Sequence, residues 1–573
     1  MNAFLNKPIF GKPAVSLVIL AVLLTVLFGF GLGGRPYSAP SESRYIEIGR
    51  EMAESGDYVT PRLDYVKYFE KPPLSYWVQA AMTKYFGLDA FAVRVPTMAF
   101  AIVLCLLTFA LGDLLYGRMT AWLGSLVLAS SLYMFALSRI VLTDVPVSVF
   151  IVATLYTFLY AARKPDSKCR AVALYAMYVS AACAVLTKGL IGAVVPGAVV
   201  FLWLALTRQW KILTNIRLLS GTALFLLVAV PWHVLVSLRN PEFPYFYFIH
   251  EHVQRYFTTV HGRYQPDWFF IVVLIAGLFP WTVFAGQALC KGFKGFWAGR
   301  FEDGTLLYLF IWVFFIVLFF SLSDSKLIPY ILPIFPPVAV LIGRYFADAW
   351  DEKPVAFFKT GLFCIMLLLL TMSVAPMVLP YAFDADSKVM AAVEQAKDAL
   401  TILPVISVIA ACLLLVTFIQ GQRRHVIMSM VAVAAAIMQT GDMIAVHYDK
   451  DSMASIARVI QNLDKPGDEV VSYDEYYQDL PAYLHRRVTV VNWEKTELAF
   501  GANHEDTSAW MINDKEFWNR WNKNDHLMFA VMRADIYKRI VGNENPEKFH
   551  LIAVTQVGRN ILFINQTPDR PKP

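Results

Sequence analysis

Fixed positive charges stand beside apolar segments at several points of this 573-residue chain. Lys71 is followed by two prolines, so it cannot lie inside a helix and its ammonium is held on a stiff turn. Arg255 carries a planar guanidinium, which suits binding to a phosphate at two points. Cations held at a bilayer surface favour lipid phosphate binding. The plainer alternative for Lys71 is a surface ion pair with Glu70 of little energetic consequence.

Other polar residues lie at the ends of apolar segments. Asp144 begins one, and a carboxylate at that depth is costly without a role or a partner. A helix N-cap before Pro146 would explain it more plainly. Lys188 lies between two apolar segments, where extension of its ammonium to the interface is the simple explanation. Lys326 and Tyr330 stand at the mouth of a later segment.

Metal-binding side chains occur in one aromatic stretch. His250, Glu251 and His252 are consecutive, and Glu70 could add a ligand from another loop. The spacing His-x-His is weak evidence of a metal site without further ligands. The stretch therefore predicts a metal site only if other loops supply ligands.

Composition defines the class of protein that must position these residues. The chain is 57% hydrophobic and only 16% charged, whereas soluble domains carry about 25% charged residues. Its net charge of +6 gives no argument for a nucleic acid partner. None of its six cysteines has Cys-x-x-Cys spacing, so we expect no structural disulfide and no cysteine-built metal site.

Repeated apolar runs predict an α-helical polytopic membrane protein with about 13 spans. We take the first run as a retained anchor, because it is long for a secretory signal and a poor cleavage site follows it. The predicted spans are 14–32, 91–115, 120–138, 142–162, 171–187, 190–207, 216–238, 268–288, 305–322, 328–347, 356–380, 401–420 and 425–447.

Alternate short loops are basic, which predicts that they face the cytoplasm together with the N-terminus. The loops 33–90, 139–143, 239–267 and 323–327 then face outward, as does the region 448–573. Short β-rich runs alternate with helical patterns in that region. We therefore expect a transmembrane domain over 1–447, with an outer catalytic loop at 33–90, and a soluble α/β domain over 448–573.

The first loop contains a predicted amphipathic helix over residues 41–54. Tyr45, Ile48 and Met52 share one face of it, Ser41 is a suitable N-cap and Gly56 a suitable stop. Such a helix would lie along the membrane surface. The alternative is an interfacial helix that only packs.

These residues resemble the lipid A aminoarabinose transferases, within the membrane glycosyltransferase superfamily of GT-C type that includes the protein O-mannosyltransferases. The matching stretches are 42–45, 51–52, 55–57, 68–73, 144, 186–189, 240–244, 248–256 and 325–333. The resemblance implies transfer of a sugar, 4-amino-4-deoxy-L-arabinose, from undecaprenyl phosphate to a lipid A phosphate. It places the reaction at the periplasmic face of a bacterial inner membrane, in a monomer that binds membrane lipids and needs no organic cofactor.

The resemblance also assigns roles to residues. The positions that would hold the carrier phosphate are Arg44, Lys71, Lys188 and Arg255. The positions that would line the site are Tyr45, Tyr68 and Tyr330. Glu70 and His250 match positions that can hold a divalent metal, and Asp144 matches an acidic site residue. Lys71 and Arg255 are the expected catalytic cations.

The chain departs from the family at one position. The family usually has Asp-Glu where this chain has Ser41-Glu42, and that aspartate is a candidate catalytic acid. A serine caps a helix about as well but cannot do a carboxylate's proton transfer at neutral pH. A phosphate acceptor is already an anion and needs no general base, so the change favours it over a hydroxyl acceptor. Glu42 or Asp144 would contact the sugar amine or replace the missing acid.

Three alternatives stay open. One is a polyprenyl-phosphate-dependent mannosyl- or glycosyltransferase acting on protein or another glycan. Another is a lipid or sugar transporter, although the sequence shows little of the broken spans in matched halves that transporters use. A third is an inactive paralogue that only binds the carrier.

Overall fold

The computed structural model describes residues 12–38, 40–257, 264–297, 304–351, 358–382, 397–445, 452–542 and 550–567. The chain divides into two compact units. The first, here the membrane unit, comprises Met1–Leu32, Thr97–Val234 and Phe248–Tyr448. The second, here the sheet unit, comprises Gly33–Pro96, Leu235–Tyr247 and Asp449–Pro573. The predicted outer loop 33–90 thus belongs to the same unit as the C-terminal region.

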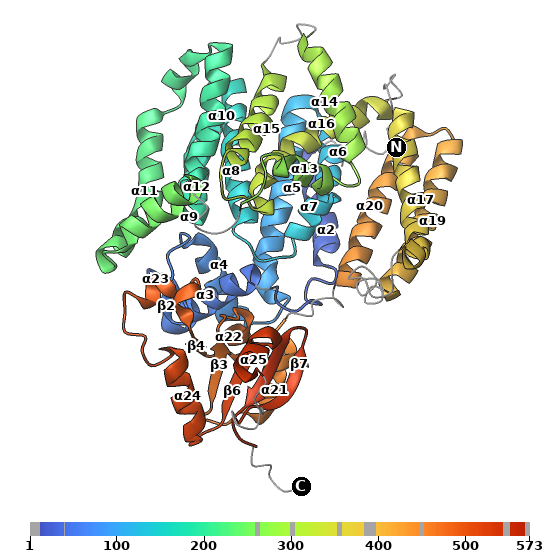
Figure 1. The fold of residues 1–573 in the computed structure, drawn as a ribbon. Helices are drawn as coiled ribbons and strands as arrows, with labels where there is room; N and C mark the ends of the chain where they lie inside the picture. The colour runs from blue at the N-terminus through green and yellow to red at the C-terminus, as the bar shows by residue number, and fades with distance from the viewer. Residues whose placement is uncertain are drawn as a thin grey trace. The chain divides into compact units, whose positions relative to one another are not determined.

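The membrane unit is helical (Figure 1). The helices lying wholly or mainly in it are α2 (Pro13–Gly29), α5 (Val95–Tyr116), α6 (Arg118–Ala129), α7 (Leu132–Leu137), α8 (Asp144–Arg163), α9 (Lys168–Lys188), α10 (Ile191–Thr207), η2 (Trp210–Asn215), α11 (Leu218–Arg239), η3 (Tyr245–Gln254), α12 (Arg255–Phe257), α13 (Phe269–Gly277), α14 (Thr282–Trp297), α15 (Thr305–Ser321), η4 (Ile328–Ile334), α16 (Phe335–Trp350), α17 (Phe358–Ala382), α19 (Lys397–Ile419) and α20 (Arg423–Ala445).

Seven helices of the described residues are long and apolar enough to cross a bilayer. A bent pair, α13 and α14, meets at 111° and would add an eighth span, and four further apolar helices are shorter. The predicted span 268–288 corresponds to this bent pair of helices, and not to one straight helix. The chain is therefore a multi-pass membrane protein with a helical core.

One predicted span, 120–138, is two helices, α6 and α7, in the structure. Ser130 and Ser131 separate them, and their hydroxyls donate to the backbone oxygens of Leu126 (2.6 Å) and Leu128 (2.7 Å). Serine side chains compete with helical hydrogen bonds in this way. Mean hydropathy is averaged over a window of residues, so a short break of this kind between two helices does not show in it.

A buried arginine ties helices together inside the membrane unit. Arg139 donates to the backbone oxygens of Phe28 (2.9 Å) and Phe30 (2.8 Å) at the end of α2. It also donates to Asp442 Oδ2 of α20 at 2.8 Å. The arginine thus satisfies carbonyls that a helix C-terminus leaves open and compensates a buried carboxylate.

The C-terminal region forms a six-stranded sheet with the order β5-β4-β3-β6-β8-β7. The strands are β3 (Glu469–Tyr473), β4 (Thr489–Val491), β5 (Met511–Ile512), β6 (Met528–Arg533), β7 (Ile552–Val557) and β8 (Asn560–Ile564). Strands β5, β4, β3 and β6 are mutually parallel, whereas β8 is antiparallel to β6 and to β7. The structure confirms a predicted α/β arrangement.

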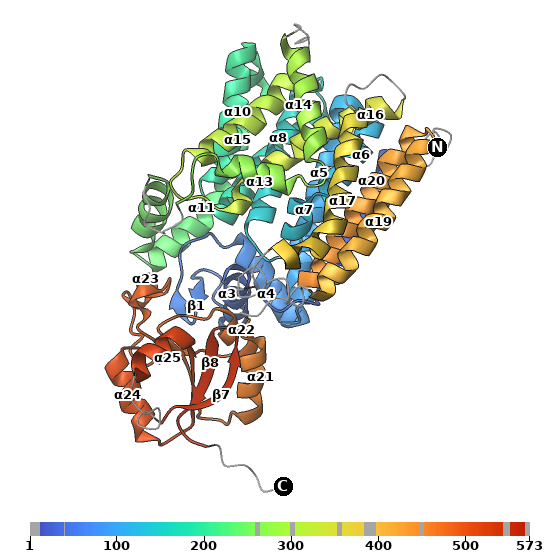
Figure 2. The same cartoon turned by 45° about the vertical axis from the view of Figure 1, so that its right-hand side comes forward.

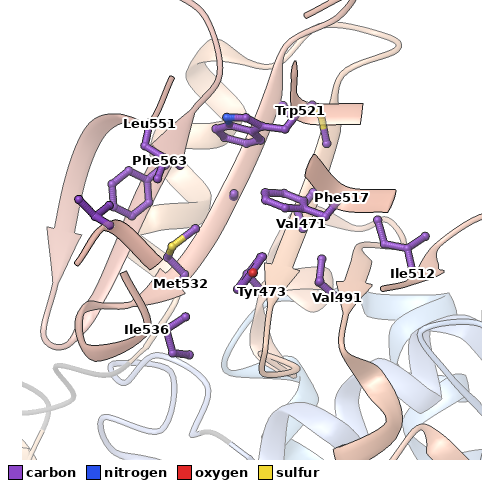
Figure 3. Close-up of a cluster of buried hydrophobic side chains, with 13 residues drawn as sticks. Val471, Tyr473, Val491, Ile512, Phe517, Trp521, Met532, Ile536, Leu551 and Phe563 are labelled. Carbon is purple, nitrogen blue, oxygen red and sulfur yellow. The ribbon is translucent and has the colours of Figure 1, made fainter. Parts of the chain in front are cut away.

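Helices cover both faces of this sheet, as Figure 2 shows for α21 and α24. The helices of the C-terminal region are α21 (Ala454–Leu463), α22 (Asp479–Leu484), η5 (Trp493–Lys495), α23 (Ala499–Ala502), α24 (Asp514–Lys523) and α25 (Ala534–Val541). Phe517 and Trp521 of α24 pack with Val471, Tyr473 and Phe563 of the strands in one apolar core (Figure 3).

The first loop contributes two helices and a hairpin to the sheet unit, namely α3 (Ser41–Ser55), α4 (Leu74–Phe86), β1 (Arg62–Leu63) and β2 (Val66–Lys67). The predicted helix 41–54 is confirmed, and Gly56 ends it with φ 70°. The predicted N-cap is wrong. The cap position is Pro40, and Glu42 Oε2 accepts a bond from the backbone N–H of Ser38 instead (2.9 Å). Residues 42–52 are all buried, so α3 is enclosed more fully than a surface helix would be.

Three carboxylates and one arginine are buried together at α3 and the hairpin. Arg50 donates two hydrogen bonds to Glu47, at 2.8 and 2.5 Å. Glu51 Oε2 accepts from the backbone N–H of Tyr65 (2.9 Å), and Asp64 Oδ1 from that of Val488 (3.0 Å). Because burial disfavours the charged form, it raises the pKa of both Glu51 and Asp64 well above the usual range.

We predict that Asp64→Asn stabilises the protein at neutral and alkaline pH by about 1–3 kcal/mol. An acid with a raised pKa in the folded state stabilises below its ordinary pKa, and this contribution is lost as pH rises through the folded value. Asparagine resembles the protonated carboxyl, so the variant should show a flatter dependence of Tm on pH. Thermal unfolding between pH 4 and pH 9 measures this, with Asp166→Asn, an exposed carboxylate, as control. Equal slopes in Asp64→Asn and wild type would contradict it.

Candidate functional site

Charged side chains from separate helices meet in the membrane unit. We call this group the cation cluster, and its members are Asp144, Lys188, Glu251, Arg255 and Tyr330. Asp144 lies in the first turn of α8, and Lys188 is the last residue of α9. Glu251 belongs to η3, Arg255 begins α12, and Tyr330 lies in η4. The structure therefore brings together four residues predicted to act on the carrier or the sugar, namely Asp144, Lys188, Arg255 and Tyr330, with Glu251, which is predicted only as a possible metal ligand.

Tyr330 joins the two cations of this cluster. The ammonium of Lys188 lies 4.6 Å from the centroid of its ring, and Nη2 of Arg255 donates to its hydroxyl at 3.2 Å. A cation over an aromatic face is held electrostatically, more strongly where water is excluded. Contacts with the single side chain of Tyr330 thus fix the positions of both positive charges.

Each cation also has a carboxylate partner. Lys188 Nζ forms an ion pair with Asp144 Oδ1, and Arg255 Nη1 donates to Glu251 Oε2 at 2.6 Å. The side chains of all four residues are at most 11% exposed. Buried charges require such pairing, because a lone buried charge is strongly destabilising.

These contacts decide between the explanations for Asp144 and Lys188. The N-cap of α8 is Thr143, so the N-cap explanation for Asp144 is wrong. Lys188 is buried against Tyr330 and Asp144, rather than extended along a surface. Both residues are therefore built into the cluster.

A second group of predicted residues lies in the sheet unit, around Arg44. The guanidinium of Arg44 pairs with Glu497, donating from Nε to Oε1 at 3.0 Å, and lies 6.0 Å from the centroid of the Tyr68 ring. The rings of Tyr45 and Tyr76 lie 6.0 Å apart. Burial raises the pKa of Tyr68 and Tyr76 well above the usual value, so both phenols stay protonated and can donate hydrogen bonds.

Lys71 lies between the hairpin and α4, outside any helix, as its two following prolines predict. It is 9% exposed, and its Nζ donates to the backbone oxygen of Glu70 at 2.7 Å. The ammonium is therefore held close to its own turn.

Glu42 is fully buried and accepts two hydrogen bonds from Arg94, at 2.9 and 2.8 Å. Arg94 also donates to the backbone oxygens of Arg35 (2.8 Å) and Pro36 (2.7 Å). These contacts give Glu42 a positioning role in the sheet unit, at the helix that Ser41 begins. Its catalytic role stays a prediction.

Sequence reasoning missed two partners, Arg94 and Glu497. Arg94 stands just before the apolar segment of α5, as Lys188 stands at the end of another, so the same positional signal could have identified it. No local sequence pattern marks Glu497 as a site residue. Its pairing with Arg44 joins residues more than 450 positions apart, which no local pattern reveals.

The predicted metal ligands stay a prediction. Glu70 belongs to the sheet unit and His250 to the membrane unit. His250 Nδ1 lies 3.6 Å from Glu251 Oε1, and within the described ranges no three His, Cys, Asp or Glu side chains could hold a metal ion. Lys71 and Arg255 likewise belong to different units, so their convergence stays a prediction too.

Two regions of the chain match known protein families. Residues 35–248 match the model of the dolichyl-phosphate-mannose-protein mannosyltransferase family, and residues 456–556 match that of the aminoarabinose transferase C-terminal domain. A curated relative from Proteus mirabilis, named undecaprenyl phosphate-alpha-4-amino-4-deoxy-L-arabinose arabinosyl transferase 1, is 35% identical over 59% of this chain and 60% of its own length. A relative from Aeromonas hydrophila, named as such an arabinosyl transferase, is 33% identical over 59% of this chain and 62% of its own length.

The chain thus spans about 60% of the length of the curated relatives it matches. A solved structure covers far more of it. The crystal structure of ArnT from Cupriavidus metallidurans bound to undecaprenyl phosphate is 28% identical, has a TM-score of 0.82, and covers 97% of this chain and 99% of its own. On these matches and on its fold, the chain is similar to the membrane glycosyltransferases that include the aminoarabinose transferases.

Proposed function

We propose that the protein transfers 4-amino-4-deoxy-L-arabinose from undecaprenyl phosphate to a phosphate of lipid A. The observation that carries the proposal is the cation cluster, in which Lys188 and Arg255 are fixed by Tyr330 and by one carboxylate each. The relatives' names specify this sugar and carrier, and the related crystal structure is described as bound to undecaprenyl phosphate.

The proposed step breaks the bond between the sugar's anomeric carbon and the carrier phosphate oxygen. The bonding electron pair leaves with that oxygen, so negative charge develops on the carrier phosphate. An acceptor phosphate oxygen forms the new bond to the anomeric carbon. Fixed cations in a site shielded from water stabilise such developing charge by several kcal/mol. Lys188 and Arg255 would do this, whereas the part of Lys71, which belongs to the other unit, stays a prediction from sequence.

The carboxylates of the cluster have a different task. Asp144 and Glu251 hold the cations in place when no phosphate is bound, so that little reorganisation is needed when the carrier arrives. They also leave the cluster without a large net charge. The phosphate therefore enters a site whose donors already point to fixed positions.

The acceptor assignment rests on Ser41. A phosphate acceptor is deprotonated at neutral pH and needs no general base, whereas a hydroxyl acceptor does. Glu42 is engaged by Arg94, which makes it a poor substitute for a free base. The phosphate acceptor is therefore the better match to this chain.

Placement in the cell belongs to the same proposal. We place the protein in a bacterial inner membrane, as a monomer, with the N-terminus cytoplasmic and the sheet unit periplasmic, because basic loops favour the cytoplasmic side. Glu70 and His250 belong to different units, so a divalent metal held by both stays a prediction from sequence. No organic cofactor is required by this chemistry.

A second candidate is transfer of a sugar to a hydroxyl of protein or another glycan. The match of residues 35–248 to the mannosyltransferase family model favours it. A mass shift of lipid A, as opposed to a glycoprotein signal, separates the two.

We predict that Lys71→Ala and Arg255→Ala each lower transfer to lipid A at least 100-fold, about 2.7 kcal/mol of barrier. Each change removes a charge expected to neutralise the departing phosphate. Mass spectrometry of lipid A from cells expressing each variant measures transfer. Lys164→Ala, an exposed cation at the other end of α8, serves as control, and immunoblots of membranes verify protein levels. Near-normal modification at equal protein levels would defeat the assignment.

We predict that Ser41→Asp leaves lipid A as the preferred acceptor, with activity within about threefold of wild type, because the phosphate acceptor needs no added base. Purified protein is offered lipid A and a hydroxyl acceptor in parallel, and Ser41→Ala is the matched control. Greater activity on the hydroxyl acceptor than on lipid A after Ser41→Asp would refute the acceptor argument.

A further inference from the structure

In the sheet of the C-terminal region, the order in which successive strands are added reverses at β3. The chain continues from β3 to β4 and β5 on one side, then returns to place β6 on the other side of β3. Loops leaving the carboxyl ends of β3 and β6 therefore diverge. In open sheets with parallel strands, ligands bind in the crevice at such a point.

A cavity of about 370 Å³ lies at these strand ends. Its lining includes residues 474–479 after β3, residues 495–497 after β4, and Arg559 and Asn560 at the start of β8. Strand β8 is antiparallel to β6, so its start lies at the carboxyl end of β6. The volume lies within the range of small-molecule sites, about 300–1,000 Å³.

The lining holds buried polar atoms that lack partners. Tyr477 is 7% exposed and Asn560 is 3% exposed. Within the part of the chain that the structure describes, the hydroxyl of Tyr477 and Oδ1 of Asn560 have no hydrogen-bond partner. Leaving a buried polar group unsatisfied is unfavourable, so a ligand with hydroxyl groups would be favoured here.

Four acidic side chains also line the cavity; three of them have close hydrogen-bond partners, and the fourth, Glu475, lies 3.9 Å from Nη1 of Arg533. Asp474 accepts from Arg539 at 2.9 Å, and Glu497 pairs with Arg44. Asp479 accepts from the backbone N–H of Met453 at 2.8 Å.

Two cations of the lining complete the site. Lys495 and Arg559 are exposed, and no carboxylate among the described residues forms an ion pair with either. The cavity therefore combines uncompensated positive charge at its edge with hydroxyl and amide groups in its wall. A phosphate suits the cations, and sugar hydroxyls suit the wall.

We propose that this cavity is a binding site for a phosphorylated sugar, separate from the cation cluster. The phosphate lies between Lys495 and Arg559, and the sugar hydroxyls bond to Tyr477 and Asn560. The loop after β3 reads Asp-Glu-Tyr-Tyr-Gln over residues 474–478 and has no glycine. A diphosphate-binding turn needs glycines for close backbone approach, so a nucleotide is not the expected ligand.

Isothermal titration of the full-length protein in detergent tests this site, with glucosamine 1-phosphate as probe and glucosamine and inorganic phosphate as separate arms. The proposal predicts saturable binding of the sugar phosphate that is at least tenfold tighter than that of either fragment. The double variant Lys495→Gln with Arg559→Gln should weaken it at least tenfold. Tyr477→Phe, which removes an unpartnered hydroxyl and keeps the shape, should weaken it about threefold to tenfold.

Lys523→Gln is the matched control, because Lys523 is an exposed lysine of the same unit at the end of α24, outside the cavity lining. It should bind as wild type does. Undiminished binding in the double variant would overturn the proposal, since the probe would then bind elsewhere, for example at the cation cluster. Equal affinity for inorganic phosphate and glucosamine 1-phosphate would overturn the sugar assignment, and absence of saturable binding would overturn the site itself.

Discussion

The requirement that a buried charge be paired governs both units of this protein. A cation enclosed among apolar helices is tolerated only beside a carboxylate or an equivalent set of acceptors. Lys188 has Asp144 and Arg255 has Glu251 in the membrane unit. Arg139 meets the same requirement with Asp442 and two backbone oxygens. Pairing of this kind holds the cations at defined positions before any ligand binds.

The same requirement explains why the first loop and the C-terminal region form one unit. Arg44 of α3 is paired with Glu497, and Asp64 of the hairpin accepts from the backbone of Val488. Arg62 and Glu505, which are partly exposed, form a further ion pair between the loop and the C-terminal region. The loop that carries Lys71 is thus shaped by contacts with a region far away in sequence. The C-terminal region therefore has a positioning role for the loop, whatever its own cavity binds.

Parts of this arrangement follow from sequence because their causes are local. Apolar runs predict helices by length and hydropathy, two prolines keep Lys71 out of a helix, and Gly56 ends α3 with a positive φ. Other parts depend on contacts that no local pattern contains. The break at Ser130 and Ser131 is invisible to averaged hydropathy. Pro40 rather than Ser41 occupies the cap position, and Glu42 accepts from the backbone N–H of Ser38.

The candidate site shows the same division. Asp144, Lys188 and Tyr330 could be selected as polar residues at the ends of apolar segments, and Arg255 as a guanidinium in an outer loop. The structure brings these four residues together. Their exact partners could not be selected, because pairing depends on how α8, α9, η3 and η4 pack. Sequence therefore predicts which residues carry charge near the membrane face, and the fold decides which of them share a site.

The most direct measurement of the central claim is the affinity of undecaprenyl phosphate for the purified protein, determined by native mass spectrometry or titration. The double variant Lys188→Gln with Arg255→Gln keeps the size of both side chains approximately and removes both charges. The account predicts at least a 100-fold loss of affinity, with wild-type affinity for the control Lys164→Gln. Wild-type affinity in the double variant would contradict the claim that these paired cations hold the carrier phosphate.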